Sequence, residues 1–140
     1  MAWSTTDIAT NDIIQQDGVF AYNFTASGAI KKGQPVYASA DNKVTVTTAS
    51  TGESDAIGFA CYDASNGEQV AIAGPGNIVV TCMDDHASTV GTALYGDTYG
   101  ILDATAGVAA KVAGYLIDNT PSDVSGSTAG TNHVIKLLVV

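Results

Sequence analysis

The amino-acid sequence predicts an all-β fold built from short strands joined by tight turns. Apolar and polar residues alternate with a period of two, as at Phe20, Tyr22 and Phe24, which fall on one face of a strand. The dipeptide Asn66-Gly67 is a strong hairpin signal, because both residues accept the positive φ that a two-residue turn requires. Only 14% of the 140 residues are charged. The polar remainder is mostly Thr, Ser, Asn and Gly, which suits strands and turns, and the length fits one domain.

The strands can be placed in order along the chain. In the first part we expect strands over residues 18–25, 35–38, 43–47, 56–62, 68–73 and 77–82. In the second, less regular part we expect them over residues 93–95, 99–102, 112–117 and 133–140. Short strands separated by regularly spaced turn signals are typical of a barrel or a sandwich.

Three segments between these strands are less regular. Residues 83–89 could form a loop or one helical turn. Residues 104–113 are rich in Ala, but Gly107 and Val108 weaken a helical interpretation. Residues 119–131 are expected to form a loop, because they contain mostly Pro, Ser, Gly, Thr and Asn.

The chain contains one faint internal similarity. Residues 57–63 resemble residues 113–118, and each segment carries a Gly, Gly58 or Gly114, just before an aromatic residue. A glycine inside a strand is typical of a bulge or a close backbone approach. The similar segments are too short to predict two repeats. The strands predict a buried core of Ile57, Phe59, Val70, Ile72, Ile78, Val80, Leu116, Ile135 and Leu137.

Charge limits the possible partners. The chain has five Lys, no Arg and 14 acidic residues, for a net charge of −9. Binding to nucleic-acid phosphates or anionic membranes requires clustered cations, so we expect neither partner. The first residues lack the basic start and apolar core of a signal peptide, so we expect synthesis in the cytoplasm. In that compartment Cys61 and Cys82 are expected to be buried thiols.

No motif predicts catalysis. The densest cluster of possible metal ligands is Asp-Asp-His at residues 84–86, to which His133 could contribute. Adjacent residues rarely converge on one ion, so we interpret this segment as an acidic loop and expect no metal and no cofactor. The sequence has no Gly-x-Ser-x-Gly motif, and Glu53 and Glu68 both fall at turns. We therefore expect no catalytic residues and no enzyme.

The order of these strands and turns resembles that of a family of small phage capsid cement proteins. The similar segments are residues 29–36, 43–44, 56–60, 67–72, 90–95, 113–116 and 134–139. The resemblance covers roughly residues 28–140 and leaves the first 25 residues outside. It implies a single compact β-barrel or β-tulip domain of short antiparallel strands, often a trimer, on the outside of an icosahedral shell. It implies no catalytic residues.

The expected function is therefore structural. The protein would decorate the capsid of a tailed bacteriophage by binding its outer surface and bridging neighbouring major capsid subunits, which stabilises the assembled shell. The expected partners are the major capsid protein and further copies of the chain in a homotrimer. Low charge over residues 74–82 and 104–113 fits burial against such partners. Two alternatives stay open, a carbohydrate-binding β-module or adhesin and a small β-barrel enzyme.

The N-terminus has a separate expected role. We expect residues 1–25 to comprise an extended arm and the first strand, and residues 26–140 to form the barrel domain. The arm carries few large apolar residues among small polar ones and cannot form a core of its own. Trp3, Ile8 and Ile13 are the expected capsid-docking residues, because an exposed tryptophan is costly unless it packs against a partner.

Overall fold

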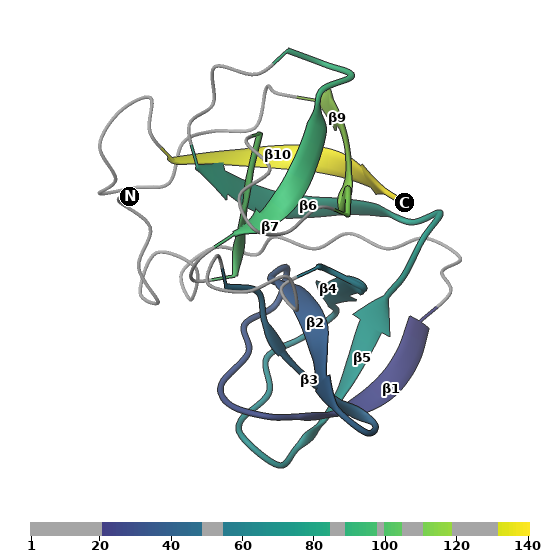
Figure 1. Cartoon of the computed structure of the whole chain (residues 1–140), viewed down its shortest axis with the longest axis vertical. Coiled ribbons are helices and arrows are strands. Elements are labelled where there is room, and N and C mark those ends of the chain that lie inside the picture. Colours follow the sequence, from purple (N-terminus) through teal and green to yellow (C-terminus); the bar gives the residue numbers. More distant parts are fainter. Residues whose placement is uncertain (1–20, 49–54, 85–88, 98–99, 105–110, 119–131) are drawn as a thin grey trace.

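The computed structural model describes residues 21–48, 55–84, 89–97, 100–104, 111–118 and 132–140 (Figure 1). Within these residues the chain forms ten strands and no helix, which confirms the predicted all-β fold class. The strands are β1 (Ala21–Ala26), β2 (Pro35–Ala40), β3 (Lys43–Val46), β4 (Gly58–Ala60), β5 (Gln69–Ala73), β6 (Ile78–Asp84), β7 (Ala93–Asp97), β8 (Ile101–Asp103), β9 (Gly114–Asp118) and β10 (Asn132–Val139).

The strands divide between two closed barrels of five strands each, where the sequence had predicted one barrel. The first barrel has the order β1-β3-β2-β4-β5, and the second has the order β10-β6-β8-β7-β9. The barrels lie one above the other along the longest axis of the molecule (Figure 1). Each described strand has a neighbour on both sides, although some pairings are short, such as the single pair Met83–Leu102 between β6 and β8.

The two barrels have the same topology. In each, the first strand in sequence pairs in parallel with the third, and the four other pairings are antiparallel. The register corresponds as well, because Val36 pairs with Gly58 in the first barrel and Leu94 pairs with Gly114 in the second. The chain is therefore a structural tandem repeat. The short similar segments in the sequence mark equivalent strands, β4 and β9.

Gly58 and Gly114 permit the same close backbone approach in the two barrels. A Cβ atom on Gly58 would lie 2.5 Å from the carbonyl oxygen of Ala73 in β5, a distance that real Cβ atoms essentially never show. A Cβ atom on Gly114 would be at least as close to the carbonyl oxygen of Leu138 in β10. The prediction that these glycines mark a close approach is confirmed.

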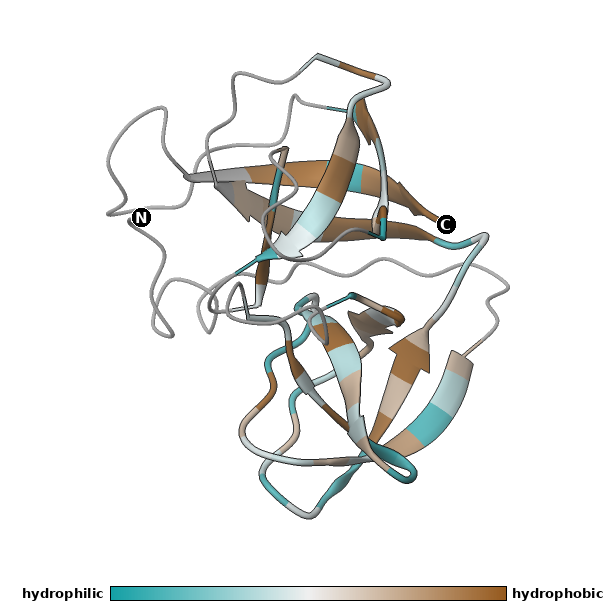
Figure 2. Cartoon of the chain, viewed as in Figure 1, coloured by the Kyte–Doolittle hydropathy of each residue, from teal (hydrophilic) through white to brown (hydrophobic). Residues whose placement is uncertain are grey.

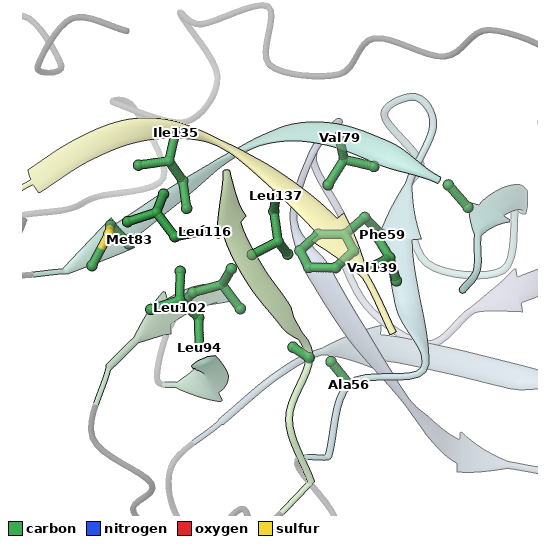
Figure 3. Close-up of a cluster of buried hydrophobic side chains, with 12 residues drawn as sticks. Ala56, Phe59, Val79, Met83, Leu94, Leu102, Leu116, Ile135, Leu137 and Val139 are labelled. Carbon is green, nitrogen blue, oxygen red and sulfur yellow. The ribbon is translucent and has the colours of Figure 1, made fainter. Parts of the chain in front are cut away.

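Each barrel contributes an apolar core. Hydrophobic residues occur on strands of both barrels, and β6 and β10 are hydrophobic over most of their length (Figure 2). The first core consists of Ala26, Ile30, Val36, Val44, Ala60, Ala64, Val70 and Ile72. The second, shown in Figure 3, consists of Ala56, Phe59, Ala73, Val79, Met83, Leu94, Leu102, Ala113, Leu116, Ile135, Leu137 and Val139. Phe59 and Ala73 belong to strands of the first barrel but pack into the core of the second, so the two barrels share part of their apolar packing.

Most of the predicted core residues are buried. The buried ones are Phe59, Val70, Ile72, Leu116, Ile135 and Leu137. Ile57 and Val80 are only partly buried. The prediction for Ile78 was wrong, because this side chain is 50% exposed. The alternation along β6 turns Val79 into the core and Ile78 to the outside.

Buried polar contacts also join the barrels. The Oγ1 hydroxyl of Thr81 in β6 donates to the carbonyl oxygen of Gly33 at 2.7 Å. The Oγ1 hydroxyl of Thr47 donates to the carbonyl oxygen of Asp97 at 2.9 Å, and the Gly100 N–H donates to the Thr47 carbonyl at 3.0 Å. Both threonines are fully buried. These bonds fix one barrel against the other, because leaving such buried groups without partners would cost stability.

Replacing Gly114 by Ala tests the close approach. We expect the variant Gly114→Ala to lose about 1–3 kcal/mol of unfolding free energy, because the new methyl group forces β9 away from β10. Gly74→Ala is the matched control, since a Cβ atom there meets nothing within 4 Å. Urea denaturation of both variants measures the difference. Equal stabilities would contradict the role assigned to Gly114.

Candidate interaction surface

The residues predicted to dock on a capsid, Trp3, Ile8 and Ile13, lie outside the described residues. So do the second and third members of the predicted acidic cluster, Asp85 and His86. Among the residues that the structure does describe, no group of three His, Cys, Asp or Glu side chains could hold a metal ion. In that same part of the chain, no helix is long and apolar enough to cross a membrane.

Acidic side chains of the first barrel hold its loops in place. An Oδ1 atom of Asp63 accepts a hydrogen bond from the Lys32 N–H at 2.8 Å. An Oε1 atom of Glu68 accepts one from the Ser65 N–H at 2.6 Å, which closes the turn before β5. Glu68 was one of the two carboxylates considered for acid–base chemistry, and its contact is that of a turn-stabilising residue.

The exposed aromatic side chains of the described residues are spread over different strands. Among the described residues the exposed ones are Tyr22, Tyr62 and Tyr115. Tyr22 lies in β1 and Tyr115 in β9, which belong to different barrels, and Tyr62 follows β4. No strand pairing places two of them next to each other. Strand pairing in the described residues therefore gives the carbohydrate alternative no specific support.

The second barrel presents a row of apolar side chains on its outside. Ile78 of β6 pairs with Leu138 of β10, and Leu138 pairs with Tyr115 of β9. Tyr115 pairs in turn with Ala93 of β7. Ile78 is 50% exposed and Tyr115 is 40% exposed, whereas Leu138 and Ala93 are half-buried. We call Ile78, Leu138, Tyr115 and Ala93 the outer row.

The first barrel has an equivalent row at the same register. Ala21 of β1 pairs with Ala73 of β5, and Ala73 pairs with Phe59 of β4. Phe59 pairs in turn with Pro35 of β2. Phe59 and Ala73 are fully buried and Pro35 is buried. We call Ala21, Ala73, Phe59 and Pro35 the joining row, because Phe59 and Ala73 pack into the core of the second barrel.

Comparison with known protein families identifies the chain. A family model described as phage cement protein matches residues 3–74, just over half of the 140 residues. The chain belongs to the phage cement protein family. The resemblance noted in the sequence is confirmed, and membership gives the protein a structural role on the phage capsid.

The matched segment differs from the one that the resemblance covered. It begins at residue 3 and therefore includes Trp3, Ile8 and Ile13, whereas the resemblance seen in the sequence covered only about residues 28–140. It ends at residue 74, directly after β5. The match thus covers the described strands of the first barrel, and those of the second barrel lie beyond it.

A solved structure has a similar fold over most of this cement protein. The chain matches the N base of the head fiber gp8.5 of bacteriophage phi29 with a TM-score of 0.55 and 14% sequence identity. The match covers 87% of this chain and 94% of that chain, and at this identity it shows the fold alone. A comparison with curated proteins found no match.

The two rows predict opposite responses to truncation. The variant Phe59→Ala should lose about 3–5 kcal/mol of unfolding free energy, because it leaves a cavity between the barrels. The equivalent variant Tyr115→Ala should change it by about 0.5 kcal/mol or less, because its side chain lies on the surface. Denaturation of dilute protein measures both values, and similar losses would contradict the difference in packing.

Proposed function

We propose that this cement protein binds the outer surface of an icosahedral capsid and bridges neighbouring major capsid subunits. The observation that carries the proposal is the family match over residues 3–74. The fold is compatible with it, because two closed barrels with apolar cores leave their outer surface available for contacts. A protein of this kind works by linkage rather than by chemistry.

The stabilising effect follows from mass action. A ligand that binds the assembled shell but not its dissociated subunits stabilises the shell by about 2.7 kcal/mol per site at 100 times its dissociation constant. Bridging adds a second effect, since subunits held by one cement molecule cannot separate independently. The net charge of −9 would also limit adhesion to released genome, whose phosphates are negative.

The proposed assembly state is a homotrimer. A threefold oligomer matches the threefold positions that an icosahedral shell provides, and each copy then contacts equivalent subunits. The protein would be made in the host cytoplasm and added to the shell from outside. The segment before β1, with Trp3, Ile8 and Ile13, would form the arm that docks on the capsid.

Decoration can be tested with shells that lack the protein. Purified protein should co-sediment with such shells, saturate at a fixed ratio to the major capsid protein, and raise the temperature at which the shells release their contents. Particle sedimentation and a DNA-binding dye measure the two effects. Failure to co-sediment, together with binding on a glycan array, would favour the carbohydrate-binding alternative.

The arm can be tested separately. Deleting residues 2–11 should weaken binding to shells while the barrels stay folded, because all described strands begin after this segment. Trp3→Ala should weaken binding in the same direction, since tryptophan is prominent among residues that dominate interfaces. Circular dichroism checks folding, and shell titration measures affinity. Unchanged affinity in both variants would mean that the arm does not dock.

A further inference from the structure

The tandem repeat places two equivalent rows on the molecule. The joining row is covered at Ala73, Phe59 and Pro35, and only its end residue, Ala21, is exposed, whereas the outer row is exposed at its centre. Phe59 of the joining row is fully buried, and it lies next to Leu137 and Val139 of the second barrel (Figure 3). Its register counterpart in the outer row is Tyr115, which is 40% exposed. The same position on the same fold is therefore an interface in one barrel and a free surface in the other.

The exposure of the outer row is not explained by a polar composition. The outer row contains no charged side chain, and neither does the joining row. The two rows differ in size, because the joining row has two alanines and a proline around Phe59. Each outer-row residue is at least as large as its counterpart, apart from Ala93, which replaces a proline. A contiguous apolar strip across four neighbouring strands is typical of a surface that binds a partner.

We infer that the outer row is a contact between copies of this chain. The inference rests on the proposed oligomer and names the surface that forms it. A second copy is the favoured occupant because the structure already shows what this row binds. In the first barrel the equivalent row packs against a barrel of the same topology, and a second copy supplies such barrels.

The charge distribution is compatible with the same occupant. Two copies that each carry a net charge of −9 repel one another, so they associate best through a surface that lacks carboxylates. The outer row satisfies this condition. In β10, the charged residue nearest to Leu138 of the outer row is Lys136, and it pairs with Asp118 of β9. Screening the repulsion with salt should therefore strengthen association through this row.

The experiment uses the full chain and a pair of matched charge variants. Tyr115→Glu places a negative charge in the outer row. Tyr62→Glu adds the same charge at a tyrosine of similar exposure, 44% against 40%, that lies outside the row. Analytical ultracentrifugation over a range of concentrations gives the association constant for each. We expect Tyr115→Glu to weaken association by about tenfold or more and Tyr62→Glu to leave it close to that of the unchanged protein.

A second measurement needs no variant. Hydroxyl-radical labelling of the unchanged protein should become slower at Tyr115 as the protein concentration rises through the association range. Labelling at Tyr62 should stay constant. Below the association range, the melting temperatures of both variants should match that of the unchanged protein, since both side chains lie on the surface and no oligomer contributes to stability there.

The contradicting outcomes are distinct. If the unchanged protein stays monomeric at every concentration, or if Tyr115→Glu associates as tightly as Tyr62→Glu, the inference is wrong. If Tyr115→Glu still forms oligomers but no longer binds shells, the outer row contacts the capsid instead, and the inference is again wrong. In each of these cases co-sedimentation of the unchanged protein with shells tests the proposed function separately.

Discussion

The close approach of neighbouring backbones at Gly58 and Gly114 is the constraint on which both barrels depend. A barrel of five short strands has a small circumference, so its strands must bend sharply and its interior must hold few side chains. At both glycines the fourth strand of the barrel approaches the last strand at a distance that excludes any Cβ atom. The missing side chains leave room inside for Ile72 in one barrel and Leu137 in the other.

The contacts between the two closed barrels make them one molecule. The two barrels are joined by residues of the repeat whose counterparts in the other barrel differ. Phe59 packs into the second core, whereas Tyr115 remains on the surface. Hydroxyl groups of Thr47 and Thr81 then reach across to backbone carbonyls of the other barrel. The barrels are thus joined by both apolar packing and directional hydrogen bonds, and the hydrogen bonds restrict their relative orientation.

The sequence predicted the positions of the strands but not their division between two barrels. Each expected strand corresponds to one observed strand, because period-two alternation and glycine-containing turns are local signals. Which strands close into one barrel is decided by long-range pairing, and alternation carries no information about it. The similar segments around Gly58 and Gly114 held that information, but they were too short to be separated from chance without the register.

The same limit explains the errors in side-chain placement. Ile78 and Val79 are adjacent apolar residues at the start of β6, and sequence alone does not say which of them faces inward. Phe59 was correctly placed in a core, although its side chain leaves its own barrel and enters the other one. For the candidate surface, the predicted residues lie before β1, outside the described part of the chain, whereas the outer row could be recognised only after the two barrels were compared.

A tandem repeat would suit the bridging role proposed for this protein. Because the two barrels share one topology and register, the position that joins them in the first barrel has a counterpart on the outside of the second, occupied by different residues. The family match ends directly after β5, and the second barrel, which carries the outer row, begins beyond it. The outer row of the second barrel leaves the large apolar side chains of Tyr115 and Ile78 exposed. A surface that faces only solvent does not require such side chains. A single internal contact therefore determines both how the two barrels pack and which surface is left for binding another molecule.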